Sequence, residues 1–580
     1  MKQADRIDIE FNRPIQTFIT SVYTMLQSSG EVAISRLEET YRNMQPVIHE
    51  KCALDQLDVS ALVYAAMRLP ASMMHVHKVF FGQSERIFNE HGVVFTGWTE
   101  VSAKARRRRY IIDSDGTMAA FIASKSDIDD LIPLILAYQI EWNKAHALLS
   151  AVAPATAKIK LQLDPGALEK PQEYPLENTL GISPSDLSRL KMVWEDNFPE
   201  LIEEMRRRPC SISIRNIEAS YCRYRREADE WWDALARQFP DIEQRPIYFV
   251  SSNTHSLINV LSGFAGSYKE EILDFARTQP ALAKEYARWN TAVEEGDLRA
   301  QQNILYYLLK KFLKSTEIPD IESVQREFEQ SSGIFRFSST RTLDIPAQII
   351  DVRRLSRELI DQGLYEEGRR NDLSFLKKSN ALILNIDYPL GRTAYLILTK
   401  IAEHVPKILG VYVVGKAASL TADCGDILIP GIVHDQHTQN TYMFENCFSS
   451  EQFDDFLEYG GRQVYDNQKA ITVLGTFIQN EQLIESIFRS GFTDLEMEAG
   501  PYLSALYEML HPKRHPEGET INYRSSDIDL GIVHYVSDNP LRGKSLGDKN
   551  LAMDGIESTY AATLNVVKRI FSREKERGLM

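Results

Sequence analysis

The sequence predicts an α/β protein in two parts, a largely α-helical N-terminal region followed by a C-terminal α/β domain with a central mixed sheet. Three observations lead to this fold class. From about residue 380 onward, short apolar runs typical of buried strands alternate with amphipathic segments. Residues 1–150 carry apolar side chains mostly at helical spacing. The length of 580 residues exceeds what one hydrophobic core supports, so two or three domains are expected.

Residues 1–150 are expected to form a mostly helical domain. Two long stretches, 62–74 and 131–149, have the helical period, and Pro70 is expected to break or kink the first of them. A β-hairpin is predicted near 109–122, because a turn-forming Asp-Ser-Asp-Gly sequence separates two short apolar runs there.

Residues 151–240 are expected to hold a linker and a helical segment. The linker extends from about Ala153 to Ile182 and is rich in Pro, Ala and Leu. Ser183 followed by Pro184 has the signature of a helix N-cap with proline at the first helical position. Helices are therefore expected from here to about Phe239.

Residues 241–580 are expected to form the α/β domain, interrupted by a helical insertion at about 266–345. The first strand candidate is Ile247–Val250, and an apolar helix is expected from Ser256. The strand candidates that follow the insertion are Ala381–Ile386, Ile408–Val414, Asp426–Ile432, Ile471–Thr476 and Leu530–Val536.

The overall composition argues against several classes of protein. The net charge of -15 disfavours general affinity for nucleic-acid backbones or anionic membranes. No apolar run reaches the ~18 residues of a transmembrane helix, and no apolar signal core follows the N-terminus. The five cysteines are scattered and lack Cys-x-x-Cys spacing, so a reduced, cytoplasmic protein is expected.

Acidic residues are the most informative feature of the chain. The segment Asp494-Leu-Glu-Met-Glu-Ala-Gly500 places three acids next to an apolar helix start, and Asp538 ends an apolar strand about forty residues later. Acidic side chains are rarely buried without a partner, so these acids are expected to serve a site.

In this order and context, the two acidic segments resemble elements of the purine nucleoside phosphorylase and nucleosidase superfamily. Glu496-Met-Glu-Ala499 is close to its ribose-binding motif, and Val536-Ser-Asp538 matches the strand end whose acid faces purine N7. The run from Ser537 to Gly543 is very similar to the Ser-Asp-Lys-Pro-Leu-His-Gly stretch of AMP nucleosidases. Further segments resemble the superfamily in the same order: Asp387-Tyr-Pro-Leu-Gly391, Val414-Gly-Lys-Ala-Ala-Ser-Leu420, Gly425-Asp-Ile-Leu-Ile-Pro430 and Gly475-Thr-Phe-Ile478.

The resemblance spans roughly residues 380–570 and is closest to AMP nucleosidases and methylthioadenosine/adenosylhomocysteine nucleosidases. It implies a nucleoside-phosphorylase-type α/β sandwich that hydrolyses the N-glycosidic bond of a purine nucleotide or nucleoside to free base and ribose or ribose phosphate. Asp538 is implied to protonate or hydrogen-bond N7, and Glu498 with the Met497 backbone to hold the ribose. The other substrate-binding residues implied are Phe477 and Ile478 around the base, Gly391, Arg392, Gly415 and Lys416 facing water or phosphate, and Glu496 and Ser537 beside the two catalytic acids.

The same resemblance carries expectations about partners. It implies a small-molecule purine nucleotide or nucleoside as partner, a homo-oligomeric assembly, and no cofactor other than phosphate, as co-substrate or effector. Neither nucleic acid nor membrane is expected to bind.

The sequence departs from the family pattern at three places. Ala417 and Ala418 replace paired glycines, and Lys416 replaces a small hydroxyl residue. Val413 stands where phosphorylases carry arginine, which favours hydrolysis over phosphorolysis. The segment 251–255 lacks the glutamate that activates water in the small nucleosidases, and His255 is the candidate substitute.

Two alternatives to the hydrolase therefore remain. One is a phosphate-dependent nucleoside phosphorylase that recruits phosphate through Lys416 or Arg392. The other is a catalytically inactive module that senses a nucleotide.

Two further clusters are candidate sites. The basic run 104–109 is interpreted as an ion-paired strand start, with an anion site as the alternative. His434 and His437 are loosely spaced and no further ligand is evident near them, so no metal site is expected there.

Overall fold

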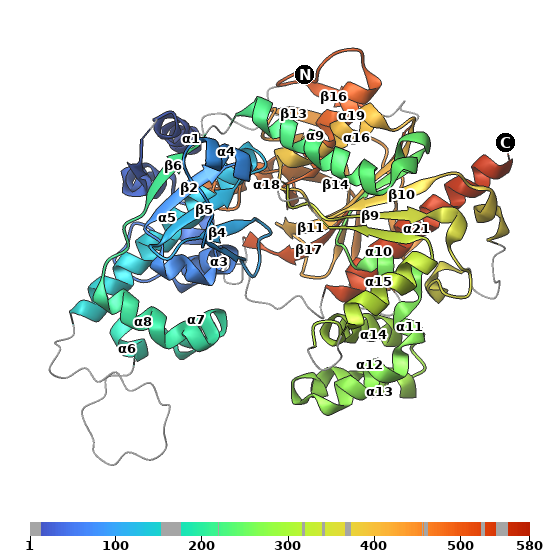
Figure 1. Ribbon diagram of the computed structural model, residues 1–580, viewed down its shortest axis with the longest axis horizontal. Helices are drawn as coiled ribbons and strands as arrows, with labels where there is room; N and C mark the ends of the chain where they lie inside the picture. Colours follow the sequence, from blue (N-terminus) through green and yellow to red (C-terminus); the bar gives the residue numbers. More distant parts are fainter. Residues whose placement is uncertain are drawn as a thin grey trace.

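The α/β class is confirmed by two separate sheets flanked by helices, one in each part of the chain (Figure 1). The computed structural model describes residues 13–28, 30–151, 176–217, 220–315, 320–338, 343–365, 373–454, 456–457, 462–523, 528–540 and 555–579. Most of the predicted linker at 153–182, and the run 541–543, lie outside these residues.

The N-terminal region contains a six-stranded sheet in addition to the expected helices. In spatial order its strands are β1 (Val32–Ala33), β6 (Ser213–Asn216), β2 (Lys78–Gly82), β5 (Thr117–Phe121), β4 (Tyr110–Ile112) and β3 (Thr99–Val101). The antiparallel pair β4 and β5 is the predicted hairpin. The other strands were not expected, because runs of two to five residues are too short to show a period. Strand β6 joins this sheet from beyond the expected boundary at residue 150.

Helix α5 (Lys125–Ser150) is the central helix of the N-terminal region, and most of its side chains are buried. The helices around it are α1 (Arg13–Leu26), α2 (Glu38–Met44), α3 (Val59–Arg68), α7 (Pro184–Trp194) and α8 (Phe198–Arg207). Helix α3 ends before Pro70, as predicted. Ser183 caps α7 by accepting a hydrogen bond from the Asp186 backbone N–H, also as predicted.

The C-terminal domain is built on an eleven-stranded mixed sheet. Its strands are β7 (Ile247–Ser251), β8 (Ile334–Phe337), β9 (Ala347–Asp351), β10 (Leu382–Ile386), β11 (Ile408–Ser419), β12 (Ile427–Asp435), β13 (Asn440–Met443), β14 (Val464–Thr472), β15 (Asp494–Glu496), β16 (Thr520–Asn522) and β17 (Asp529–Asp538). The predicted strands correspond to β7, β10, β11, β12 and β17, whereas the candidate Ile471–Thr476 overlaps β14 only at the last two residues of that strand. At the centre, β10, β7, β11 and β17 run parallel, so their carboxyl ends lie at one edge.

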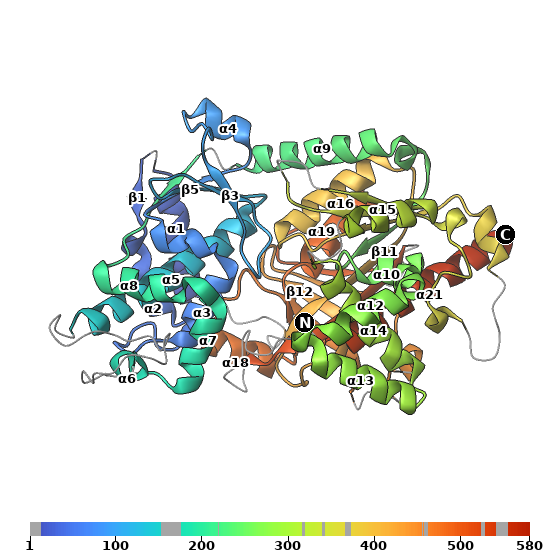
Figure 2. The same cartoon turned by 60° about the horizontal axis from the view of Figure 1, so that its bottom comes forward.

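Helices cover both faces of this sheet (Figures 1 and 2). One face carries α9 (Tyr221–Gln238), α16 (Arg392–His404) and α19 (Ala499–Leu510), and the other carries α10 (Ser256–Ser262) and α21 (Ile556–Leu579). Strand β7 shows the consequence: Phe249 belongs to one apolar core and its neighbour Tyr248 to the other. A strand buried on both faces is a continuous apolar run, which is why this strand was visible in the sequence.

The helical insertion packs beside α10 and α21. Its helices are α11 (Phe264–Ser267), α12 (Lys269–Thr278), α13 (Ala283–Glu294), α14 (Leu298–Phe312) and α15 (Ile321–Ser331), and strand β8 follows them. Among the residues that the structure describes, no helix is both long and apolar enough to cross a lipid bilayer.

Candidate functional site

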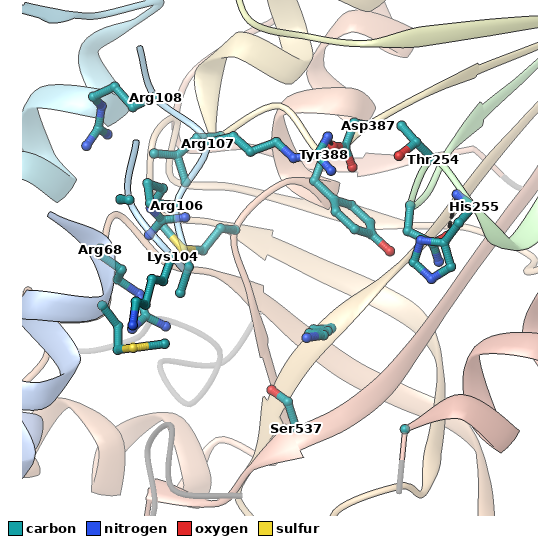
Figure 3. A pocket seen from close by; sticks show the side chains of 18 of the residues that line it. Arg68, Lys104, Arg106, Arg107, Arg108, Thr254, His255, Asp387, Tyr388 and Ser537 are labelled. Atoms are coloured by element: carbon teal, nitrogen blue, oxygen red, sulfur yellow. Dashed lines mark hydrogen bonds and ion pairs between the residues drawn. The ribbon is translucent and has the colours of Figure 1, made fainter. Parts of the chain in front are cut away.

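A cavity of about 1960 Å³ lies between the N-terminal region and the C-terminal sheet. The N-terminal region supplies one wall through α3 and the basic run 104–109. The sheet supplies another through the segments that follow its parallel strands, and α14 of the insertion contributes further lining residues. In Figure 3, Arg68, Lys104 and Arg106 gather on one side, and Thr254, His255 and Tyr388 lie opposite them. Ligands of open α/β sheets bind beyond the carboxyl ends of parallel strands, and this cavity has that position.

Strands β11 and β17 carry Lys416, Ser537 and Asp538 to the cavity. The register of these strands shifts between Ala417 and Ala418, which places one extra residue in β17 at this point. The Ser537 hydroxyl donates to the carbonyl of Ala417 at 3.2 Å and to Asp538 Oδ2 at 3.1 Å. These contacts hold Ser537 against both the bulge and the candidate acid.

Glu496 and Glu498 have different surroundings although two residues separate them. Glu496 is buried, and its Oε2 accepts the backbone N–H groups of Glu498 and Ala499 at 2.6 Å, so it satisfies the free N–H groups where α19 begins. Glu498 is half-buried and lines the cavity. Burial, together with the nearby Glu496, raises the pKa of Glu498 to about 8. Of the two glutamates, Glu498 thus has its carboxyl group free to titrate near neutral pH.

A buried ion pair lies beside these glutamates. His534 Nδ1 of β17 is 2.7 Å from Asp494 Oδ2 of β15. Burial opposes charge on the imidazole, but Asp494 and the two glutamates outweigh it and raise the pKa of His534 to about 9. His534 is therefore a fixed positive charge beside the acidic segment. Sequence reasoning missed it, because nothing in the sequence relates position 534 to position 494.

The basic run of the N-terminal region faces the cavity and is also ion-paired. Arg106 and Arg108 both contact Asp130, at 2.6 and 3.0 Å. Arg107 pairs with Asp387 across the cavity, so this side chain joins the N-terminal region to the C-terminal sheet. An ion-paired run and an anion site are therefore compatible interpretations, since the paired arginines also line the cavity.

His255 lies where the missing water-activating glutamate was expected. It follows β7 and lines the cavity. Burial, then the charges of Lys310, Arg107, Lys416 and Arg336, lower the pKa of His255 to about 3. Its imidazole is therefore neutral at physiological pH.

Phe477 and Ile478 lie outside the cavity, in the apolar core. The Phe477 ring packs against Tyr64 of α3 with ring centroids 5.3 Å apart, and against Tyr41 at 6.4 Å. The N-terminal region covers the segment that is expected to contact the base, so these two side chains do not reach the cavity.

Gly391, Arg392 and Gly415 also do not line the cavity. The Arg392 backbone N–H donates to Ser126 Oγ at 2.9 Å, and its guanidinium donates to the carbonyl of His437 at 3.0 Å. The N-terminal region therefore occupies the start of α16, where an anion was expected. Gly415 is buried within β11. Of the expected residues, the cavity brings together Lys416, Glu496, Met497, Glu498, Ser537 and Asp538.

His434 and His437 are both engaged in hydrogen bonds. His437 Nδ1 is 2.8 Å from Asp435 Oδ1, and its Nε2 is 3.2 Å from Ser126 Oγ. His434 Nδ1 is 3.0 Å from Thr441 Oγ1.

Arg68, Tyr388 and Lys310 line the cavity and were not singled out from the sequence. Arg68 lies over the Tyr64 ring, with its guanidinium carbon 3.4 Å from the ring centroid. The sequence gives only weak evidence that Lys310 belongs to a site. It lies at the cationic C-terminal end of an amphipathic helix, and cations at that position are usually explained by the helix dipole.

Solved structures of nucleosidases and phosphorylases are similar to part of this chain at low identity. A putative methylthioadenosine nucleosidase from Weissella paramesenteroides matches at 11% identity and a TM-score of 0.28, covering 42% of this chain and 93% of the other. A 5′-methylthioadenosine/S-adenosylhomocysteine nucleosidase from Neisseria meningitidis matches at 13% identity and a TM-score of 0.27, covering 44% and 94%. A purine nucleoside phosphorylase from Toxoplasma gondii matches at 11% identity and a TM-score of 0.25, covering 43% and 88%. At these TM-scores the likeness carries no information about activity.

The comparison with curated proteins found no match. The comparison with protein families found one whose model matches residues 34–572, nearly the whole length, including every wall of the cavity and every strand of both sheets except β1. The chain therefore belongs to DUF6909, a family of unknown function.

Proposed function

We propose that this protein hydrolyses the N-glycosidic bond of a purine nucleotide or nucleoside, in the manner of an AMP nucleosidase. The observation that carries the proposal is that Glu498 and Asp538 line one cavity at the carboxyl ends of parallel strands. Cleavage of such a bond needs a donor for the leaving base and a carboxylate for the sugar, whose positive charge develops in the transition state.

In this proposal Asp538 gives a proton or hydrogen bond to N7 of the purine. Ser537, whose hydroxyl donates to Asp538 Oδ2, orients that carboxyl group. Glu498 and the Met497 backbone hold the ribose hydroxyls, and the Glu498 carboxylate stabilises the oxocarbenium-like sugar. Glu496 acts by holding the start of α19, from which Glu498 reaches the cavity.

Water is the proposed nucleophile, and His255 is the proposed group that accepts its proton. A neutral imidazole has a free lone pair for this purpose. Its pKa of about 3 makes it a weak base, because it is buried and four cations lie near it. An anionic substrate that neutralises these cations would raise the pKa of His255 and make it a better base.

Phosphorolysis remains as the second candidate, favoured by the cations near His255. Lys416 is its remaining phosphate ligand, since Arg392 does not line the cavity. No cofactor is proposed for either reaction.

The test incubates the purified protein with a panel of purine nucleosides and nucleotides, with and without phosphate, and measures free base by chromatography. Base release without phosphate, reduced about 10²–10⁴-fold in Asp538→Asn, is expected for the hydrolase. The matched control is Asp55→Asn, an exposed aspartate outside the cavity, which should retain full activity. Release that requires phosphate would indicate a phosphorylase. Tight nucleotide binding without any release would leave a nucleotide sensor.

A further inference from the structure

The cavity has a strongly cationic end that hydrolysis of a plain nucleoside does not use. Helix α14 and the residues just after it contribute Lys310, Lys311 and Lys314. The other cations in this part of the lining are Arg107, Arg326, Arg336 and Lys416, which come from four separate segments. An acidic protein of net charge -15 concentrates positive charge here, inside a cavity.

Five of these cations, Lys310, Lys311, Lys314, Arg326 and Lys416, have no ion pair with a carboxylate in the part of the chain that the structure describes. Arg336 forms a two-point ion pair with Glu329, and Arg107 pairs with Asp387. Lys310 and Lys416 have no such carboxylate partner among the described residues, and both side chains are exposed to the cavity. Ammonium groups that face one another without a carboxylate are suited to an anionic ligand.

The electrostatics of the neighbouring groups agree with this geometry. The pKa of Lys310 is lowered by its burial and then by Lys314, Lys416, Lys311 and Arg107. The same end of the cavity lowers the pKa of His255. After burial, the largest contributions to both pKa values come from cations, so positive charge predominates at this end of the cavity.

The size of the cavity sets the scale of the ligand. About 1960 Å³ exceeds the roughly 300–1,000 Å³ of a typical small-molecule site. The acidic residues Glu498 and Asp538 and the cationic end share this one cavity, and Lys416 lies on the strand paired with the one that carries Asp538. A ligand with a sugar at Glu498 and several phosphates would use both ends, whereas one phosphate would leave most of the cations without a partner.

We propose that Lys310, Lys416 and Arg107 form a subsite for a chain of phosphates, and that the substrate is a nucleoside 5′-diphosphate or 5′-triphosphate. This inference rests on the proposed function. In the reaction the C1′–N9 bond breaks and the oxygen of water bonds to C1′. One proton of that water stays on the new C1′ hydroxyl, His255 takes the other, and Asp538 gives a proton to the departing purine, so the net result is the transfer of one proton from water to the base. The phosphate chain stays intact, so the products are the free purine and ribose 5-diphosphate or 5-triphosphate.

The kinetic test compares adenosine, AMP, ADP and ATP, and the guanine series, for release of base at fixed ionic strength, with and without Mg²⁺. The expected order of kcat/KM is triphosphate, then diphosphate, then monophosphate, with the nucleoside lowest. Lys310→Met keeps side-chain length and removes the charge. It should lower the ratio of kcat/KM for ATP to that for adenosine about tenfold, the size of one lost charge-assisted contact. Lys284→Met, which removes an exposed lysine of α13 outside the cavity, should leave that ratio unchanged.

A binding measurement that needs no turnover accompanies the kinetics. Inorganic tripolyphosphate is titrated into the wild-type protein by calorimetry. Binding that weakens at least about tenfold in Lys310→Met/Lys416→Met, but not in Lys284→Met, supports the subsite. Circular dichroism and the thermal midpoint establish that the double variant is folded.

The outcomes separate this inference from the proposed function. Base release from nucleosides or monophosphates, without preference for longer phosphate chains and without tripolyphosphate binding, overturns the subsite and leaves the hydrolase. Binding of tripolyphosphate and ATP without release of base supports the subsite and overturns the glycosidase and its substrate assignment. Release of inorganic phosphate in place of base overturns the substrate assignment as well.

Discussion

At the scale of single residues, the acidic segment divides two tasks between two glutamates. The Glu496 carboxylate accepts hydrogen bonds from backbone N–H groups, whereas the Glu498 side chain lines the cavity. Because burial and a like charge raise the pKa of Glu498 to about 8, its ionisation falls in a range where activity can be measured.

We predict that kcat/KM rises with pH through about 8 and then levels off, because the proposed mechanism needs the Glu498 carboxylate. The pH profile of base release measures this. Glu496→Gln removes the like charge while keeping a hydrogen-bond acceptor, so the rise should move to lower pH. A flat profile between pH 6 and 9, or a Glu498→Gln variant with wild-type activity, would contradict the role given to this side chain.

A second residue-scale prediction concerns the stability of the His534–Asp494 pair. The folded-state pKa of His534 is about 9, above an unfolded value near 6.5, so the pair stabilises the fold below pH 6.5 and loses this contribution as pH rises through about 9. The size is about 3 kcal/mol. Urea denaturation at several pH values measures it. Asp494→Asn and His534→Gln should each remove this pH dependence, and a slope that persists in both would assign it to other groups.

At the scale of elements, one buried ion pair ties the start of β7 to the end of β9. Arg245 donates to both carboxylate oxygens of Asp351, at 2.8 and 3.0 Å, and each residue is less than a tenth exposed. Strands β7 and β9 flank β10, so this pair fixes the ends of three strands whose opposite ends lead to the cavity.

We predict that Asp351→Asn destabilises the protein by about 3–5 kcal/mol, because it leaves the buried guanidinium of Arg245 without its counterion. Denaturant unfolding measures the change. Asp274→Asn is the matched control, since Asp274 pairs with Arg277 at 2.9 Å on the surface and its loss should cost less than about 1 kcal/mol.

The same pair predicts behaviour in acid. Burial opposes ionisation of Asp351, but the hydrogen bonds from Arg245 and Arg353 lower its pKa to about 2. The stabilisation is therefore present above the unfolded pKa near 4 and is lost as pH falls toward 2. An Asp351→Asn variant whose stability fell between pH 4 and 2 as steeply as that of the wild type would refute this assignment.

At the scale of the whole molecule, the two parts of the chain share one apolar core. This core includes side chains of α1, α3 and α5 together with those of α16, α19 and the segment after β14. Phe477 lies at the junction, 3% exposed and in ring contact with Tyr64. The N-terminal region is therefore a structural part of the site, since it supplies one wall of the cavity and packs over Phe477 next to it.

We predict that Phe477→Ala destabilises the whole protein by about 3–5 kcal/mol, and that calorimetry shows a single transition for wild type and variant, because the shared core couples both parts. Phe488→Ala is the control, since that ring of α18 (Glu481–Arg489) is 44% exposed and its loss should cost less than about 1 kcal/mol. Two separate transitions, with only one of them shifted, would show that the parts unfold independently.

The strands of the central sheet were predictable because parallel strands buried on both faces are continuous apolar runs. Strands β10, β11, β12 and β17 all follow this rule. The N-terminal sheet was predictable only at its hairpin, where turn residues mark the strands. Its other strands are too short for a period, and their partners are far apart in the sequence: β2 pairs with β6 more than a hundred residues later.

For the candidate site, the sequence alone determined the strand ends and the acidic residues that they carry. Glu498, Asp538, Ser537 and Lys416 follow from local motifs, and they do line one cavity. The tertiary structure alone decided which other residues join them. Arg68, Arg107 and Lys310 line the cavity although they come from two other parts of the chain. Phe477 and Arg392 instead contact the N-terminal region. The physical reason is that motifs record local backbone geometry, whereas exposure of a side chain depends on what packs over it from distant parts of the chain.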